Sequence, residues 1–144
     1  MRTRGVVAFG WMLVSLWLVW ATATAVAQSV TTLTVQTYWS PDVGTGAALM
    51  KVIEDFHREH PGVRINYVYV PFAELVPTIL RQALTGTLPE VVFADNPDVP
   101  HLAAAGVFKD ITPMVQRWGQ WEDFFVGPRL ATTLEGRIYA LQMV

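Results

Sequence analysis

The stretch "TVQTYWSPDVGTGAALMKVIEDF", residues 34–56, predicts a strand, a glycine-containing turn and a helix in direct succession. Threonine, valine and aromatic residues dominate as far as Trp39, which is typical of a strand. Apolar residues then recur with the spacing of one helix face, at Leu49, Val52, Ile53 and Phe56. Because Gly44-Thr45-Gly46 lies between the two elements, the first question is whether the turn binds phosphate.

The residues after this turn argue against a nucleotide site. A dinucleotide-binding fingerprint needs a third glycine where this chain has Leu49, and a P-loop ends in Gly-Lys-Ser/Thr, whereas Lys51 here precedes Val52. What remains is a helix N-terminus with free N–H groups, beside an aromatic residue and Asp42. This chemistry suits a polar, uncharged ligand such as a sugar, whose hydroxyls bond to carboxylates and whose flat face stacks on an indole.

The rest of the chain alternates between strand and helix patterns. Strands are expected at 31–39, 63–70, 90–94 and 137–141, and helices at 46–60, 72–86, 96–106, 112–118 and 122–133. We expect the short apolar run 90–94 to be buried on both faces, and Asn96 to be the N-cap of its helix. This alternation predicts an α/β fold with a mainly parallel sheet and helices on both faces.

Residues 1–27 read as a signal peptide. A positive start (Arg2 and Arg4) is followed by the apolar run 5–20 and by Ala25-Val26-Ala27, the small-residue pattern that signal peptidase cuts. The alternative is an uncut membrane anchor, because about 20 apolar residues are enough to span a bilayer. The chain has no cysteine, which excludes a lipid-anchored lipoprotein and a disulfide framework.

The expected mature segment, 28–144, is mildly acidic. The whole chain has a formal net charge of −2, which becomes −4 without Arg2 and Arg4. Nucleic-acid binding selects basic patches, so nucleic acid is a poor partner for this chain. Export through the signal peptide predicts a periplasmic or extracellular location.

Ligands of parallel sheets bind outside the carboxyl ends of the strands. Polar and aromatic residues gather at three of these ends in the sequence, and we expect them to form a ligand site: Trp39, Ser40, Asp42, Phe72, Asp95 and Asn96. Each has a structural alternative. The aromatic residues can simply pack at a strand end, Asp42 can favour the following helix N-terminus, and Asp95 and Asn96 can cap a helix.

The order of several segments resembles a known family. These segments are "LTVQTYW", "ALMKVIEDFHREHPGVRINYVYVP", "ILRQALTGTLPEVVFAD", "LAAAGVFKDITP" and "EGRIYALQ", spread over residues 33–142. They resemble the extracellular solute-binding proteins of bacterial ATP-binding-cassette importers, in the sugar-binding branch. The resemblance implies a Venus-flytrap (class II periplasmic-binding-protein-like) fold that delivers a sugar, polyol or sugar-like solute to membrane permease subunits. It implies no catalytic residue and no cofactor in this chain.

Two features depart from the family pattern. Gln142 stands where members commonly have proline, and Val144 comes where members cross into a second lobe. The resemblance therefore implies that 28–144 is a partial N-terminal lobe. We expect such a lobe to have an exposed sheet edge and to bind ligand very weakly or not at all by itself.

Three other interpretations are weaker. His57 and His60 stand at metal-ligand spacing, but no third ligand is evident and helix ends often carry histidine. Asp95 and Asp98 resemble a glycosidase carboxylate pair, although Asp98 suits the first turn of a helix. The alternative to transport is a membrane-anchored extracytoplasmic sensor or interaction domain, with the run 6–20 kept as an anchor.

Overall fold

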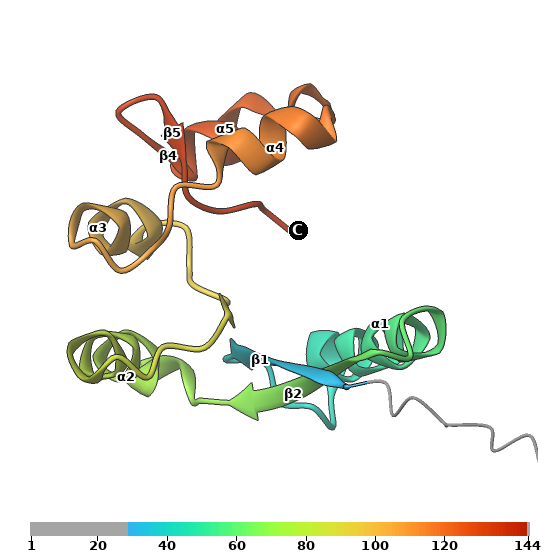
Figure 1. The fold of residues 1–144 in the computed structure, drawn as a ribbon. Helices are drawn as coiled ribbons and strands as arrows, with labels where there is room; N and C mark the ends of the chain where they lie inside the picture. Colours follow the sequence, from blue (N-terminus) through green and yellow to red (C-terminus); the bar gives the residue numbers. More distant parts are fainter. Residues whose placement is uncertain (1–28, 144) are drawn as a thin grey trace, which may run out of the picture.

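The computed structural model describes residues 29–143, so the predicted signal peptide at 1–27 lies outside the described residues. Figure 1 shows the arrangement. The elements are β1 (Thr31–Thr37), α1 (Gly44–Glu59), β2 (Val63–Tyr69), α2 (Phe72–Thr85), β3 (Val91–Val92), α3 (Asp98–Ala104), α4 (Thr112–Trp118), the 3₁₀ turn η1 (Trp121–Asp123), α5 (Val126–Ala131), β4 (Thr133–Leu134) and β5 (Arg137–Ile138).

The main sheet is parallel and has the order β2-β1-β3. Residues 31–37 of β1 pair in register with residues 63–69 of β2, and Val35 and Gln36 pair with Val91 and Val92 of β3. The chain moves from β1 outward to β2 and then back across β1 to β3. Right-handed crossovers in opposite directions place α1 and α2 on opposite faces of the sheet, as predicted, and Figure 1 shows the strands between the two helices.

Helix α1 begins where its first turn packs against the end of β1. An added Cβ on Gly46 would lie 1.9 Å from the carbonyl oxygen of Ser40, so only glycine fits at this position. The helix ends at Glu59, and the N–H of His60 donates to the carbonyl oxygen of Phe56 at 2.8 Å. Pro61 then prevents further helix.

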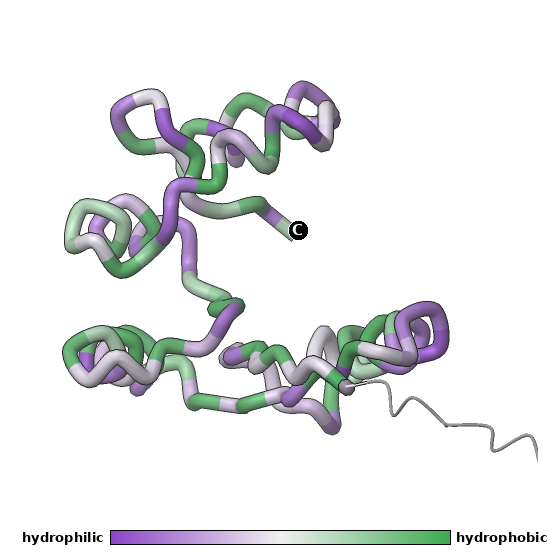
Figure 2. The backbone as a smooth tube through the Cα atoms, in the orientation of Figure 1, coloured by the Kyte–Doolittle hydropathy of each residue, from purple (hydrophilic) through white to green (hydrophobic). Residues whose placement is uncertain are grey.

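Helix α2 is amphipathic and carries the core. Leu75 and Ile79 are fully buried and pack with Leu102 of α3. Figure 2 shows hydrophobic segments in both α2 and α3, which lie one above the other in this view. Pro77 is the sixth residue of α2, so its missing N–H removes one bond inside the helix.

A buried amide pair joins α2 to the sheet. The Nε2 of Gln82 donates to the Oε1 of Gln36 at 2.9 Å, and Gln36 is fully buried in the centre of the sheet. Gln36 lies on the opposite face of β1 from Val35, because successive side chains of a strand alternate.

The third strand and the following turn differ from the prediction. The strand β3 has only Val91 and Val92, and Val91 is 46% exposed, so the expectation of burial on both faces is wrong. Among residues 29–143, β3 pairs with β1 alone. Asn96 is not an N-cap: α3 begins at Asp98, and the backbone N–H of Asn96 donates to its neighbour Asp95.

The C-terminal part also differs from the prediction. The expected helix 122–133 is divided into η1 and α5, because Phe124 takes an extended conformation between them. The expected strand 137–141 is the short β5, which pairs antiparallel with β4 and does not join the main sheet. A left-handed backbone at Glu135 and Gly136 closes this two-residue hairpin.

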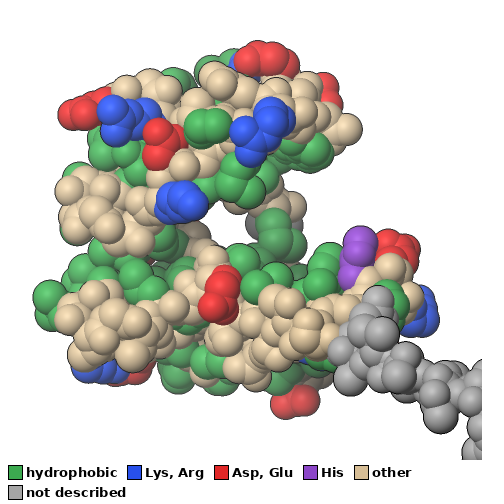
Figure 3. Space-filling model, in the orientation of Figure 1, with side chains coloured by type: hydrophobic (Ala, Val, Ile, Leu, Met, Phe, Trp, Pro, Cys, Tyr) green, Lys and Arg blue, Asp and Glu red, His purple; other side chains and the backbone are tan. Residues whose placement is uncertain are grey.

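The hairpin is fixed to α4 by two hydrogen bonds. Ile138 donates its N–H to the hydroxyl of Thr112 at 2.8 Å, and its carbonyl accepts from the N–H of Ile111 at 2.9 Å. Ile138 and Val115 are buried. The space-filling view is hollowed between the layer that contains the sheet and the layer of α4 and α5 (Figure 3). Within residues 29–143, no helix is long and apolar enough to cross a membrane.

Candidate functional site

Four aromatic rings meet at the carboxyl ends of the three parallel strands. The centroids of Trp39 and Phe93 are 5.2 Å apart, those of Tyr38 and Phe72 are 5.2 Å apart, and those of Tyr38 and Trp39 are 5.4 Å apart. We call Tyr38, Trp39, Phe72 and Phe93 the aromatic cluster. Tyr38 and Trp39 follow β1, Phe72 opens α2 just after β2, and Phe93 follows β3.

The cluster joins two residues that the sequence predicted with two that it missed. Trp39 and Phe72 were expected at this edge, and the chain of ring contacts through Tyr38 connects them. Tyr38 and Phe93 were not among the predicted ligand residues. Phe93 belongs to the apolar run that predicted the third strand, and its position two residues before Asp95 was the available signal.

Asp95 lies at the same edge as the cluster. Burial, and then the negative charge of Asp95, raise the pKa of Tyr38, so the carboxylate is close enough to act on the phenol. The Oδ1 of Asp95 accepts from the N–H of Asn96 at 3.0 Å, and its carbonyl accepts from the N–H of Asp98 at 3.0 Å. These bonds form a turn that holds the half-buried carboxylate next to the rings.

Ser40 and Asp42 occupy the turn between β1 and α1. Ser40 is half-buried, and its carbonyl oxygen lies against the first turn of α1. Gly46 leaves room for this oxygen because it has no side chain. Asp42 is exposed and precedes the N-cap residue Val43, whose side chain makes no capping bond. No contact described in the structure brings Asp42 to the aromatic cluster.

The arrangement combines apolar ring faces with a carboxylate and turn amides. Phe72 is 56% exposed, while Trp39 and Asp95 are half-buried, so the edge is accessible to a ligand. Indole rings offer large, rigid, apolar surfaces, and a carboxylate accepts hydrogen bonds from hydroxyls. The chemistry suits a flat, hydroxyl-rich molecule.

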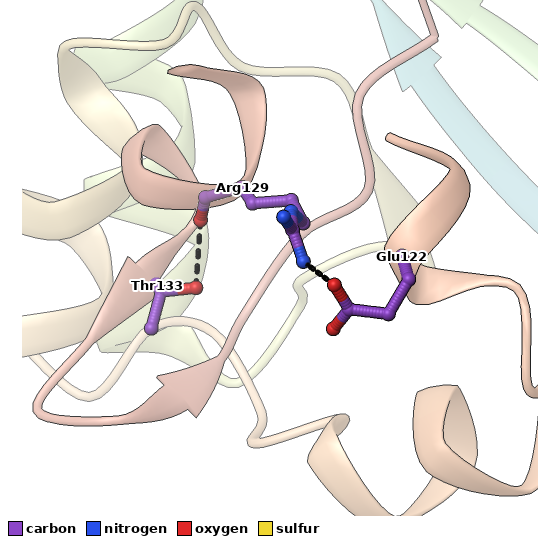
Figure 4. A network of polar contacts seen from close by, with 3 residues as sticks. All are labelled: Glu122, Arg129 and Thr133. Carbon is purple, nitrogen blue, oxygen red and sulfur yellow. Dashed lines mark hydrogen bonds and ion pairs between the residues drawn. The ribbon is translucent and has the colours of Figure 1, made fainter. Parts of the chain in front are cut away.

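Two surface hollows lie away from this edge. One of about 260 Å³ is lined by Trp121, Val126, Arg129, Leu130 and Thr133. Figure 4 shows its polar side, where Arg129 pairs with Glu122 and accepts a bond through its carbonyl from the Thr133 hydroxyl at 2.7 Å. The hollow is therefore formed by α5 and its neighbours, remote in sequence from the aromatic cluster.

The second hollow, of about 440 Å³, surrounds His57 and is lined also by Glu54, Arg58 and Arg64. The Nε2 of His57 accepts a hydrogen bond from the backbone N–H of Ile65 at 2.8 Å, which gives the ring a structural role at the edge of β2. Residues 29–143 contain no group of three histidine, cysteine or acidic side chains that is placed to hold a metal ion.

A protein-family comparison matches most of the chain. Residues 40–141 match the family model described as bacterial extracellular solute-binding protein. A search of curated proteins finds no match.

Solved structures with similar folds include several sugar-binding proteins. The GacH receptor of Streptomyces glaucescens, solved without ligand and with acarbose, is 25% identical with a TM-score of 0.69, over 78% of this chain and 28% of that one. A protein with mannotriose bound is 25% identical with a TM-score of 0.68, over 77% of this chain and 28% of that one.

A third similar structure shows the fold alone, because its identity is lower. It is the galacto-N-biose/lacto-N-biose I-binding protein of the ABC transporter from Bifidobacterium longum, with 17% identity and a TM-score of 0.66, over 78% of this chain and 28% of that one. The chain thus spans 28% of the length of each of these three proteins. The matches confirm the predicted periplasmic-binding-protein-like α/β fold.

Proposed function

Because the chain belongs to the bacterial extracellular solute-binding protein family, we propose that it contributes to the capture of a sugar or sugar-like solute outside the cytoplasm, for delivery to an ATP-binding-cassette permease. The observation that carries the proposal is the meeting of Trp39, Phe72, Phe93 and Asp95 at one edge of the sheet. This edge is where open parallel sheets bind their ligands.

Trp39 is the proposed stacking surface, and Asp95 the proposed acceptor for sugar hydroxyls. Phe72 is the exposed apolar neighbour of Tyr38 and extends the ring surface. Ser40 and Asn96 supply backbone and side-chain polar groups in the turns beside Trp39 and Asp95. Asp42 is the most remote candidate, since it is exposed at the start of α1.

The proposed division of the chain is a signal peptide at 1–27 and part of an N-terminal lobe at 28–144. In this family of folds, ligands bind between lobes and shift an equilibrium between open and closed forms. A single edge offers only part of such a site. We therefore expect dissociation constants of about 1 mM or weaker for this chain, equivalent to about −4 kcal/mol.

Saturation-transfer-difference NMR tests the proposal, because it detects weak binding. The protein is mixed with mannotriose, maltotriose, acarbose or lacto-N-biose at millimolar concentration. We expect saturation transfer from the protein to at least one of these sugars. The transfer should be strongest at the C–H groups of the sugar ring, because these stack on the indole. Trp39→Ala should abolish the transfer and Asp95→Asn should weaken it.

The matched control is Trp118→Ala, which removes a 48% exposed tryptophan from α4, an element remote from the aromatic cluster in sequence. Transfer that survives Trp39→Ala, or that is lost equally in Trp118→Ala, would contradict the proposed site. Micromolar affinity would contradict the expectation that the site is partial.

We propose that the chain is not an enzyme. The carboxylate of Asp95 is engaged in a turn with Asn96, and Asp98 starts α3, so each has a structural role that a catalytic pair would not require. Reducing-sugar release from the same panel tests this: turnover that Asp95→Asn abolishes would favour a glycosidase.

A further inference from the structure

The peptide groups on both sides of Trp39 are held by side chains. Its backbone N–H donates to the hydroxyl oxygen of Thr37 at 3.2 Å, and its carbonyl accepts from the phenol O–H of Tyr67 at 2.7 Å. Thr37 is fully buried at the end of β1, and Tyr67 is half-buried in β2.

These two side-chain hydrogen bonds replace the sheet hydrogen bonds beyond the end of β1. The last ladder bond beside this position runs from the N–H of Val70 to the carbonyl of Thr37 at 2.9 Å. Trp39 lies beyond the strand in a bend, so neither of its peptide groups is part of the regular sheet. A peptide group outside the ladder still needs a partner when it is partly buried.

The two bonds give each group of the Trp39 residue a side-chain partner, the N–H on Thr37 and the carbonyl on Tyr67. Burial raises the pKa of Tyr67, and the neighbouring Thr37 hydroxyl offsets part of that rise. The Trp39 N–H therefore donates to Thr37, and the Tyr67 O–H donates to the Trp39 carbonyl. A tyrosine phenol is protonated at neutral pH, and burial raises the pKa of Tyr67 further, so Tyr67 remains a hydrogen-bond donor.

Strand register explains why Tyr67 reaches this position. Tyr67 pairs with Val35, and Tyr69 pairs with Thr37. Residues two apart share a face of the strand, so Val35, Thr37 and Tyr67 lie on the same side of the sheet. The long phenol side chain of Tyr67 therefore extends to the peptide that follows the strand, whereas Tyr69 is 47% exposed.

We propose that Tyr67 and Thr37 are positioning residues that fix the direction of the Trp39 indole, so that ligand affinity depends on side chains outside the aromatic cluster. The expected effect on ligand affinity rests on the sugar-binding function proposed above. The positioning itself is independent of any ligand.

Fluorine NMR of the protein labelled with 5-fluorotryptophan tests the positioning directly. The Trp39 resonance is assigned as the one lost in Trp39→Phe. Tyr67→Phe removes one oxygen and should shift, broaden or split this resonance, because the Trp39 peptide gains freedom. The resonances of Trp118 and Trp121 should not change, which shows that the fold is retained.

Tyr69→Phe is the matched control, since it removes a phenol oxygen from the same strand. It should leave the Trp39 resonance unchanged. A second pair of variants covers the case in which Tyr67→Phe fails to fold: Thr37→Ser keeps the hydroxyl and should preserve the resonance, and Thr37→Val removes it and should not. A Trp39 resonance that is the same in wild type, Tyr67→Phe and Thr37→Val would overturn the proposal.

The binding consequence is measured on the same proteins. Loss of one hydrogen bond that leaves a partly buried carbonyl unpaired should weaken sugar binding about fivefold to tenfold in Tyr67→Phe. If the wild-type protein binds the sugar and Tyr67→Phe binds it with the same affinity, the proposed role of Tyr67 in ligand affinity is refuted. A changed resonance together with no sugar binding by wild type would instead refute the proposed function and leave the positioning correct.

Discussion

Replacement of Gly46 by alanine should destabilise the protein, although alanine is the better helix former. The added Cβ would lie 1.9 Å from the carbonyl oxygen and 2.6 Å from the carbonyl carbon of Ser40. Ordinary contact begins at 3.4 Å, so either the first turn of α1 or the preceding turn at Ser40 must move by about 1.5 Å. Both partners are backbone, so no rotamer change relieves the overlap.

The magnitude follows from two opposing contributions. Overpacking typically costs about 1–3 kcal/mol, and a backbone overlap belongs at the upper end of that range. Glycine to alanine within a helix contributes about 1 kcal/mol in the other direction. The expected net loss is about 2 kcal/mol, which is a large part of the 5–15 kcal/mol typical of a domain.

Urea unfolding followed by far-UV circular dichroism measures this loss. With a slope of about 2 kcal/mol per molar urea, the midpoint should fall by about 1 M. Gly62→Ala is the control, since a Cβ added at Gly62 meets no atom within 4 Å, and it should leave the midpoint unchanged or raise it slightly. A Gly46→Ala midpoint at or above that of wild type would refute the packing argument.

Three further variants test other contacts. Gln82→Leu should cost about 1–3 kcal/mol because it leaves the fully buried Gln36 without its partner, whereas Gln36→Leu combined with Gln82→Leu should recover most of that loss. His57→Phe should lower the thermal midpoint, since it removes the acceptor of a β2 amide. Asp110 has a pKa held below its ordinary value of 3.8 by the Thr112 hydroxyl and then by the Thr112 amide, so its contribution to stability is present above pH 3.8 and is lost as the pH falls through the lowered pKa.

The corresponding measurements are a urea double-mutant cycle for the glutamine pair and thermal unfolding for the other two variants. An additive cycle would show that the two amides do not interact. An unchanged midpoint in His57→Phe would mean that water replaces the imidazole. For Asp110→Asn, the deficit relative to wild type should shrink at a pH well below 3.8, and a deficit independent of pH would contradict the assignment.

Most regular elements of the fold were predictable because their signals are local. The 3.6-residue spacing of Leu49, Val52, Ile53 and Phe56 gave α1 to within two residues of its observed start. Alternation of strand and helix then implied a parallel sheet, whose carboxyl ends must share one edge. The strand and helix order alone therefore predicts that Trp39 and Asp95 lie in the same part of the molecule.

The errors occurred where a local signal competed with a distant partner. Asn96-Pro97 is a good start for a helix, but a turn closed by Asp95 shifts α3 to Asp98. The run 137–141 has the composition of a sheet strand. Its hydrogen bonds go instead to β4 and to residues 111–112, which composition does not reveal.

The sequence by itself determined where strands and helices form, since hydrophobic period and turn residues act within a few positions of one another. Only the tertiary structure decided which rings join Trp39 and which hydroxyls hold its peptide groups. Tyr67 is 28 residues away along the chain and reaches Trp39 only because β1 and β2 pair in one particular register. A shift of one residue would turn Tyr67 to the other face of the sheet, and no local pattern contains that information.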